Sequence, residues 1–523
     1  MISDPLFHGL KIRFTGQDYL RQFPDQFGSY LMFGCDMSSA FEGTLFRFPL
    51  RSSETAASSE LRPEAYTSHA VRELLDSLRS RITELLLFLK NVKHVEVYRK
   101  TAPDQQPELL FRASREAGAG QPEATEISNF VRGGDAKARA TSKASFYQRL
   151  QTADIKKLPM ESNRMRVTVA DGPGSAEVAE EWLVCSSLGR GAQRICSMCL
   201  SEEGQRLKLL PWGGAAARLS REQVTTADTA DNGEEGAEAN ASEAQSGLEV
   251  AVRGRAYCFL PLPAETALPV HINGFFELSS NRRDIWQGDD LVGGGRLRAD
   301  WNSALLEDVA APSYGQLLLY SRKLLGGSDA YYGLWPQQRT AEPWRGMVGV
   351  MYRMLLRQPV LHSELQGGSW VSPAAAVFAD APGGADAAEA SAPAEIHSVL
   401  LRSGLPLVRV PAAVESQLHE AAASSGVSLR FASGALVRGW LREHGGWEEG
   451  LTRDEAVVVL RHVVSGLLGD DLRELHGLRL LPLLDGGWGR LDAPGDASPL
   501  LLCAASERPL LAPHAGLVVD VDL

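Results

Sequence analysis

The sequence predicts an α/β protein that contains more than one structural unit. Helical and strand-like patterns follow one another along the chain, and pairs of strands separated by turn residues occur in both halves. A chain of 523 residues exceeds one ordinary hydrophobic core, so roughly two to four units are expected. Two stretches that are poor in large apolar residues, beginning at residues 221 and 379, interrupt these patterns and mark expected boundaries.

The composition is that of a folded protein and argues against nucleic acid as a partner. Apolar residues make up 44% of the chain and charged residues 23%, and the net charge is −12 without a basic stripe. Nucleic-acid binding needs clustered Lys and Arg to neutralise phosphates. No stretch approaches the roughly 20 apolar residues of a membrane span, so no membrane contact is expected.

The six cysteines are scattered, and the first residues, MISDPLFHG, have neither a basic start nor an apolar core. Both features favour a reducing, cytoplasmic location over a secreted one. Cys196 and Cys199 have the spacing of a zinc-binding pair, but no second pair or histidine follows nearby. Buried thiols are therefore expected here, and no metal site is predicted.

The first 113 residues predict a strand, a helix and a strand pair. Residues 44–51 alternate around Phe46 and Phe48, the period-2 pattern of a strand that begins at Gly43-Thr44. A helix is expected to start at Thr67 or Ser68, because large aliphatic residues then recur with helical spacing. Two strands, at 92–98 and 108–113, follow it, and residues 114–145 are expected to be a loop.

A helix at 146–155 and two strands, at 164–170 and 179–187, are predicted next. The strands flank Asp171-Gly172-Pro173-Gly174, which is a turn sequence. The same letters fit the DxGxG of a GHKL-type adenine pocket, but the upstream helix with Glu and Asn that such a pocket needs is not present. The hairpin interpretation is therefore preferred. The acidic residues at 221–249 contain too few large apolar side chains to order themselves, so a disordered insertion is expected.

The stretch from Tyr257 to Trp286 holds the arginine pair Arg282-Arg283 at the end of an extended apolar run. Paired guanidinium groups suit phosphate or carboxylate recognition. The alternative is that both arginines pair with nearby aspartates at the surface. His271 is expected to be a strand histidine rather than a base, and the large aromatic residues Trp212, Trp286 and Trp301 are expected in the core.

The C-terminal part predicts helices at 414–422, 435–441 and 454–467 and a strand at 406–410, and 478–489 has the pattern of a hairpin. Helices are also expected at 302–325 and 347–356. The sequence contains no Walker motif, His-Glu-x-x-His helix or Gly-x-Ser-x-Gly elbow. The residues alone therefore predict no complete catalytic set.

Several short stretches occur in order along the chain, namely FPDQF at 23–27, FGCD at 33–36, GTLFRFPLR at 43–51, LLFLKNV at 86–92, LPWGG at 210–214, FLPLP at 259–263, LPVHING at 268–274 and LSSNRR at 278–283. Taken together they resemble the large repeats of the sacsin family, and a fainter resemblance continues through GLRLLPLLDG at 477–486.

Sacsin repeats are similar to the ninety-kilodalton heat-shock chaperones, which have a GHKL-type (Bergerat) ATPase domain followed by a middle domain. The resemblance implies that Gly43 and Thr44 lie near the nucleotide and that Arg282 and Arg283 form the phosphate-contacting loop, with Arg283 the closer match. The implied organisation is an ATPase-domain remnant at 1–65, a middle-like α/β domain at 66–220 and 250–378 around the acidic insertion at 221–249, a linker at 379–396 and a C-terminal α+β unit at 397–523.

The resemblance further implies a chaperone or co-chaperone module that binds client proteins and possibly the seventy-kilodalton heat-shock chaperone. The Glu, Asn and DxGxG of the nucleotide pocket are not found in this sequence. The chain alone is therefore expected to use no cofactor and to lack ATPase activity, with ATP and Mg²⁺ relevant only if an N-terminal segment is supplied. The alternatives are the distal part of such an ATPase and a plain interaction scaffold.

Overall fold

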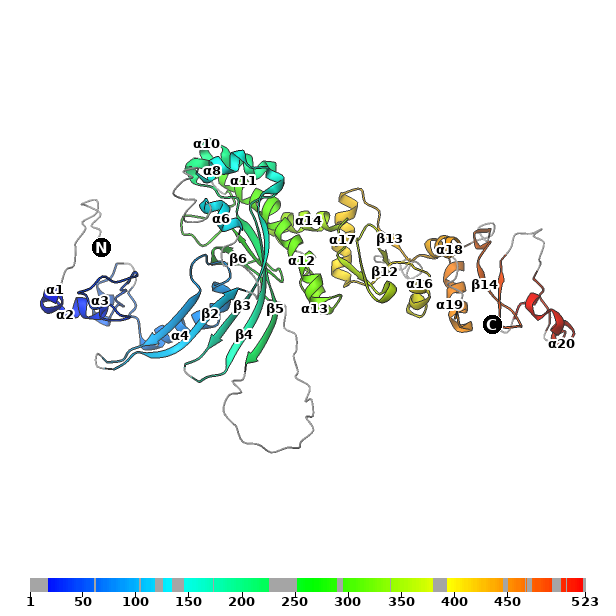
Figure 1. The fold of residues 1–523 in the computed structure, drawn as a ribbon, viewed down its shortest axis with the longest axis horizontal. Coiled ribbons are helices and arrows are strands. Elements are labelled where there is room, and N and C mark those ends of the chain that lie inside the picture. The colour runs from blue at the N-terminus through cyan, green and yellow to red at the C-terminus, as the bar shows by residue number, and fades with distance from the viewer. Residues whose placement is uncertain are drawn as a thin grey trace, which may run out of the picture. The chain divides into compact units, whose positions relative to one another are not determined.

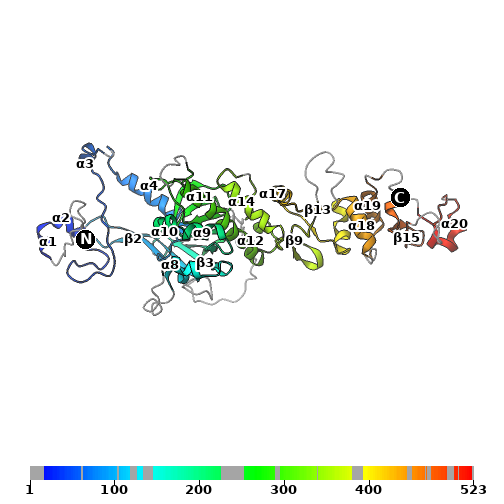
Figure 2. The same cartoon turned by 90° about the horizontal axis from the view of Figure 1, so that it is seen from above.

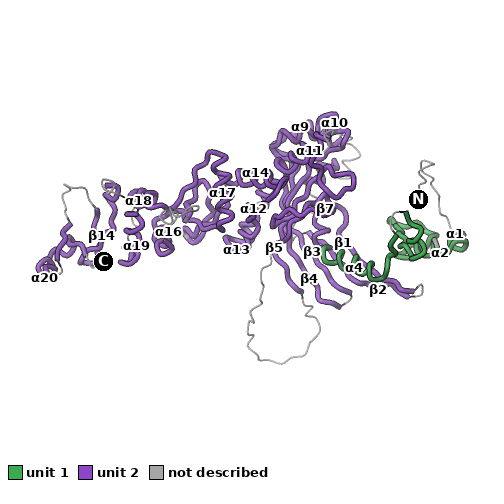
Figure 3. The backbone as a smooth tube through the Cα atoms, turned by 180° about the vertical axis from the view of Figure 1, so that it is seen from behind, with its two compact units in different colours: residues 1–81 green, residues 82–523 purple. Residues whose placement is uncertain are grey.

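The structure is a computed structural model with two compact units, residues 1–81 and 82–523 (Figure 3), each considered by itself. It describes residues 17–60, 63–102, 105–117, 126–133, 145–172, 174–224, 252–288, 295–338, 340–379, 393–444, 450–465, 467, 473–491, 500–504 and 506–520.

The first unit consists of short helices joined by extended segments. Thr67 caps the longest helix, α4, by accepting a hydrogen bond from the Ala70 backbone N–H, which confirms the predicted start. Residues 44–51 are extended but join no sheet among the described residues, so the predicted strand at Gly43-Thr44 is wrong. The helices are α1 (Gln17–Gln22), α2 (Pro24–Phe27), η1 (Gly28–Tyr30), α3 (Ser53–Ala57) and α4 (Ser68–Arg79).

The second unit is built around an eight-stranded sheet in the order β1-β2-β3-β4-β5-β8-β6-β7 (Figure 1). Neighbouring strands are antiparallel except for the parallel pair β6 and β8, so the sheet is mixed and the predicted α/β class is confirmed. The strands are β1 (His94–Arg99), β2 (Glu108–Ala117), β3 (Met160–Ala170), β4 (Glu177–Ser187), β5 (Gly213–Val224), β6 (Arg255–Cys258), β7 (Leu260–Glu265) and β8 (His271–Gly274).

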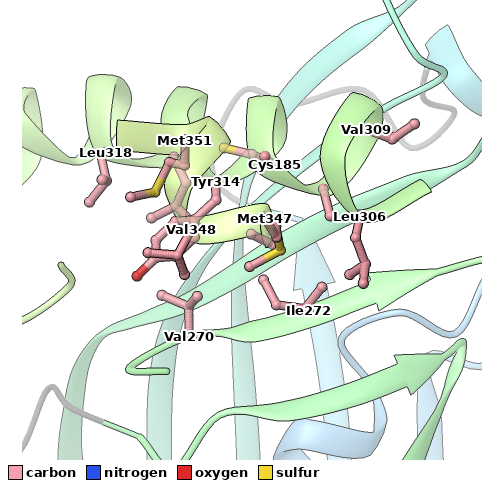
Figure 4. Packing of buried hydrophobic residues seen from close by; sticks show 14 of the residues in the cluster. Cys185, Val270, Ile272, Leu306, Val309, Tyr314, Leu318, Met347, Val348 and Met351 are labelled. Atoms are coloured by element: carbon pink, nitrogen blue, oxygen red, sulfur yellow. The ribbon is translucent and has the colours of Figure 1, made fainter. Parts of the chain in front are cut away.

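A nearly continuous helical run packs on this sheet. The run consists of α11 (Gly295–Leu305), the π-helical turn η3 (Leu306–Ala310) and α12 (Ala311–Leu325), and α12 contacts β4 and β5. α14 (Trp344–Leu355) packs against α12. Figure 4 shows the resulting core, in which Met347 of α14 and Leu306 of η3 lie near Ile272 of β8. The helices predicted at 302–325 and 347–356 are confirmed.

A group of shorter helices packs beside the sheet (Figure 2). α9 contacts α8, α10 and α11. The helix predicted at 146–155 corresponds to α8. Ser145 and Gln148 form a capping box at its N-terminus, in which each side chain bonds to the backbone N–H of the other residue. The loop predicted at 114–145 is wrong in part, because 114–117 continue β2 and α6 lies within it. These helices are α5 (Ile82–Leu85), α6 (Glu126–Arg132), α8 (Phe146–Thr152), η2 (Ile155–Lys157), α9 (Gln193–Leu200) and α10 (Glu202–Leu207).

The C-terminal part has a second hydrophobic cluster and two small sheets. The predicted strand, helices and hairpin are all found, and β14 pairs with β15 antiparallel. The elements are α13 (Asp329–Tyr332), β9 (Leu361–Ser363), η4 (Leu365–Gly367), β10 (Ser369–Val371), β11 (Val377–Phe378), η5 (Ala394–Ile396), α16 (His397–Arg402), β12 (Leu407–Val408), α17 (Ala412–Ser424), β13 (Arg430–Phe431), α18 (Gly434–Glu443), α19 (Arg453–Val464), β14 (Arg479–Pro482), β15 (Trp488–Arg490), α20 (Arg508–Leu511) and η7 (Ala512–Leu517).

The disorder predicted at 221–249 is wrong for residues 221–224. Residues 221–224 continue β5, and Glu177 of β4 is in register with Val224, because pairing with β4 orders these polar residues. Residues 225–249, and 380–392 of the linker predicted at 379–396, lie outside the described residues. The eight-stranded sheet takes its strands from both sides of the insertion. No helix within the described ranges is long and apolar enough to cross a membrane.

Candidate arginine loop

Residues 278–285 form a closed loop that presents Arg282 and Arg283. Leu278 and Ile285 form an antiparallel bridge at its base, and the Ser279 backbone N–H donates to the Asp284 carbonyl over 2.9 Å. Inside the loop, Asn281 Oδ1 accepts hydrogen bonds from the Arg283 backbone N–H (2.8 Å) and from Ser279 Oγ (2.7 Å). The sequence Ser-Ser-Asn-Arg-Arg-Asp thus closes the loop through its own polar side chains.

Asn302, a buried residue of α11, holds both chain segments that enter the loop. Its Nδ2 donates to the carbonyl oxygens of Glu277 (2.8 Å) and Trp286 (2.9 Å), and its Oδ1 accepts from the Glu277 backbone N–H (2.9 Å). Trp301 Nε1 donates to the Phe275 carbonyl just upstream. The loop therefore stands on a helix that is itself part of the core. The sequence predicted Trp301 as a core residue but gave no sign of the role of Asn302.

Both arginines are exposed, and Arg282 has a left-handed backbone with φ of +57°. Such a conformation is uncommon for a residue with a side chain and is held by its surroundings. The alternative prediction was that both arginines pair with nearby aspartates at the surface. Among the described residues neither guanidinium forms an ion pair with Asp284, and Asp289 and Asp290 lie outside the described residues. Two adjacent guanidinium groups on a fixed loop can donate hydrogen bonds to an anion that binds from outside the loop.

Gly43 and Thr44 belong to the other compact unit. Both are exposed on the extended segment, and a Cβ on Gly43 would meet the Phe41 ring at 2.8 Å. The structure therefore gives these two residues a surface position, and their predicted closeness to a nucleotide stays a prediction.

The turn at residues 171–174 joins β3 to β4, whose register runs without a break from Met160 opposite Ser187 to Ala170 opposite Glu177. Gly172 and Gly174 have φ of +60° and +80°, which suits a tight turn and favours glycine. The hairpin interpretation is confirmed.

Cys196 and Cys199 lie on α9 and are both buried in the main core. Burial, followed by the nearby Asp308 carboxyl, raises the pKa of the Cys196 thiol to about 11. Burial also raises the pKa of the Cys199 thiol, whose Sγ donates to the Leu209 carbonyl over 3.6 Å. Within the ranges that the structure describes, no three metal-binding side chains cluster. The expected buried thiols are confirmed.

His271 lies on β8 between the rings of Trp182 and Tyr257 and is completely buried. Its Nδ1 accepts a hydrogen bond from the Arg255 backbone N–H over 3.1 Å. Burial, together with the charges of Arg255 and Arg218, lowers the pKa of His271 to about 3. The ring is therefore neutral and packed, as expected for a strand histidine.

The structure also shows two groups of charged and aromatic residues whose association was not predicted from the sequence. Glu180 and Arg218 form a buried ion pair of 3.4 Å inside the sheet, and Trp182 Nε1 donates to Glu180. The second group lines a cleft of about 480 Å³ and includes Lys90, Trp212, Phe259 and Asn273. Each of these four lies in a stretch that carries the family resemblance, but only the fold shows that the stretches meet.

Comparison with known proteins gives two matches. The Sacsin domain family matches residues 4–112. Human sacsin is 28% identical over 512 residues, which is 94% of this chain and 10% of human sacsin. The chain therefore spans about a tenth of the length of that relative. No solved structure matches the chain. These two matches support the resemblance to the sacsin family that the sequence shows.

Proposed function

We propose that this chain is a chaperone or co-chaperone module that assists protein folding or quality control by binding other proteins. The observation that carries the proposal is the similarity to human sacsin along 94% of the chain. Its proposed partners are client proteins and the seventy-kilodalton heat-shock chaperone, and its proposed location is the cytoplasm. The proposed module would bind its partners without hydrolysing ATP by itself.

Exposed aromatic residues in the first unit support this proposal. Phe33, Phe46 and Phe48 are 63%, 77% and 79% exposed, and the rings of Phe46 and Phe48 stack with centroids 6.3 Å apart. Large apolar groups gathered on a surface favour association with apolar segments of other proteins. Such segments are what unfolded clients expose.

The test is the suppression of aggregation of a heat-denatured client, citrate synthase, by the full chain at near-stoichiometric ratio. Light scattering should fall with increasing chain and should stay high with an equal mass of serum albumin. If scattering is unchanged at a tenfold excess, the chaperone proposal fails, and a plain interaction scaffold becomes the better description.

The second candidate is the distal part of a GHKL-type ATPase, with an ATPase-domain remnant and a middle-like domain. The ordered arginine loop favours it, since fixed guanidinium groups can stabilise phosphoryl oxygens. The described residues do not by themselves fit a nucleotide, because Gly43 and Thr44 are exposed and Asp171 stands in a hairpin turn. We therefore derive no catalytic step through ATP in this chain.

This candidate is tested by measuring ATP turnover of the chain with and without a GHKL-type nucleotide-binding segment fused upstream. The candidate predicts turnover only in the fusion, and Arg283→Ala should reduce it about 100-fold or more, as for other charge-stabilising donors. Arg296→Ala removes another exposed arginine, on α11, and should leave the rate unchanged. Equal rates for Arg283→Ala and the parent fusion would exclude the arginine role.

A further inference from the structure

The cleft beside Lys90 crosses one face of the eight-stranded sheet. Its walls come from the segment after α5, from the ends of β1 and β2, from β3 and β4, and from Trp212, Phe259 and Asn273. Its volume of about 480 Å³ lies within the range of small-ligand sites. All of these residues belong to the second compact unit.

Lys90 is held in this cleft by aromatic faces. Its Nζ lies 4.2 Å from the ring centroid of Trp212 and 4.2 Å from that of Phe259. These two rings are themselves packed edge to face, with centroids 5.3 Å apart. An ammonium over two rings is attracted by their negative faces, yet its N–H donors stay available to a stronger acceptor.

The lysine lacks a carboxylate partner in the part of the chain that the structure describes. Lys90 is an exposed residue, and burial of part of it, followed by the charge of Arg132, lowers the pKa of its ammonium. Other cationic side chains line the same cleft, namely Lys93, Arg115 and Arg164, against the carboxylates of Glu116 and Glu161. Arg164 also pairs with Glu181 over 3.6 Å, which leaves an excess of one positive charge. In a chain of net charge −12 this local excess of positive charge favours an anion.

The aromatic pair is fixed before any ligand arrives. Phe259 has a left-handed backbone with φ of +60°, and its N–H donates to Oδ1 of the buried Asn273 over 2.9 Å. Strained backbone of this kind persists only where neighbouring groups hold it, and it is concentrated at functional sites.

Two arginines fix the chain on either side of Lys90. Arg115 Nη1 donates to the carbonyl oxygens of Leu86 (3.0 Å) and Leu89 (2.7 Å), and Arg132 Nη2 donates to Asn91 Oδ1 (2.9 Å). The chain that carries Lys90 is therefore held on both sides, and the two rings contact its ammonium. Such preorganisation reduces the entropy lost on binding.

We propose that this cleft binds a carboxylate attached to an apolar group, with the Lys90 ammonium donating to the carboxylate. Leu87, Met165 and Val184, which line the same cleft, contact the apolar group. A small free acid and a peptide are the two sources of such a carboxylate, and the test below separates them. This inference does not depend on the chaperone proposal.

The test uses the methyl group of Met165, which lies in the cleft wall, as a local NMR probe. The full chain is labelled at its methionine methyl groups, and Met165→Leu assigns the signal. 2-Naphthoate is titrated first, followed by its neutral amide and by the cation 2-naphthylmethylammonium. We expect the Met165 signal to shift with naphthoate and affinity to fall about tenfold for the amide, the loss that one charge-assisted hydrogen bond represents.

Variants of Lys90 decide whether the ammonium is the binding group. Lys90→Met keeps the apolar stem and should weaken naphthoate about tenfold, whereas Lys90→Arg keeps the charge over the rings and should retain binding. Lys323→Met, at an exposed position on α12 outside the cleft, is the matched control and should bind as the parent does. Unchanged thermal unfolding shows that each variant is folded.

Equal binding of naphthoate and its amide, stronger binding of the cation, or unchanged affinity in a folded Lys90→Met would overturn the proposal. A short peptide that ends in Phe with a free carboxylate is then compared with the same peptide amidated at its C-terminus, to separate the two sources of the carboxylate. Tighter binding of the free-carboxylate peptide than of naphthoate assigns the site to polypeptides. The opposite order assigns it to small acids, and both orders support the carboxylate site.

Discussion

β4 and the segment at residues 44–51 were both predicted as strands, but among the described residues only β4 joins a sheet. Trp182 of β4 is 0% exposed, whereas Phe46 and Phe48 are 77% and 79% exposed. β4 pairs with β3 on one side and β5 on the other, and α12 packs over it. The comparison shows that a period-2 pattern indicates a strand only where a sheet exists to receive it.

The largest expected effect comes from the buried pair beside Trp182. Arg218→Met leaves the buried Glu180 carboxylate with only the exposed Arg221, whose Nε lies 3.7 Å from it, and should lower the free energy of unfolding by up to about 3–5 kcal/mol. Urea unfolding followed by tryptophan fluorescence measures this loss. If β4 tolerates the change, its burial is not what distinguishes it from residues 44–51.

The exposed pair of Arg99 and Glu108, 2.7 Å apart on the strand pair β1 and β2, provides the control. Arg99→Met should cost less than about 1 kcal/mol, because exposed ion pairs contribute little. Combining Glu180→Gln with Arg218→Met should recover a large part of the loss, since a neutral amide then replaces the buried carboxylate. A double variant as unstable as Arg218→Met would contradict the charge argument.

Asn302→Ala extends the comparison to the arginine loop, which is surface chain anchored to the core. The change removes three hydrogen bonds to Glu277 and Trp286 and should cost about 2–3 kcal/mol. Hydrogen exchange of the amides at 278–285 should accelerate at the same time. Ser303→Ala, on the same helix, removes one partly exposed contact to Glu307 and should leave that exchange unchanged.

The third prediction concerns pH and the buried His271. The pKa of the folded state is about 3, below the ordinary value of 6.5, so at pH between these values the unfolded chain binds a proton that the folded chain does not. The free energy of unfolding should therefore fall as the pH drops below 6.5, by about 2 kcal/mol on reaching pH 5. Above pH 6.5 this residue should have no effect.

His271→Gln should flatten that pH dependence even if it lowers stability at every pH. The groups that face the ring are Arg255, Arg218 and Glu84, together with the two aromatic rings. His462 also has a pKa lowered by burial and contributes a dependence that remains in the variant. His69→Gln, at an exposed position on α4, should leave the slope as it is. A slope that survives His271→Gln unchanged would refute the assignment.

Local patterns predicted most elements from Thr67 onward, because their apolar spacing, caps and turns agree with the fold. The hairpin around Asp171 and the helix at Phe146 are examples. The strand prediction for residues 44–51 was wrong, because strand formation depends on a pairing partner that no local pattern reveals. The arginine loop was located from its sequence, but the clamp by Asn302 and the meeting of Lys90 with Trp212 and Phe259 depend on contacts far apart in the chain.

The smallest expected effect on stability is the sharpest test of what residues 44–51 do. Phe46→Ser combined with Phe48→Ser should change the free energy of unfolding by less than about 0.5 kcal/mol, because both side chains are already exposed to solvent. In the aggregation assay the same variant should lose activity, since it removes apolar surface available to a client. Phe46→Leu combined with Phe48→Leu keeps that surface apolar and should keep the activity.

A serine variant that unfolds more easily would mean that the rings are buried in solution. A serine variant that protects the client fully would place client binding elsewhere in the chain. The difference between β4 and residues 44–51 would then be one of packing alone.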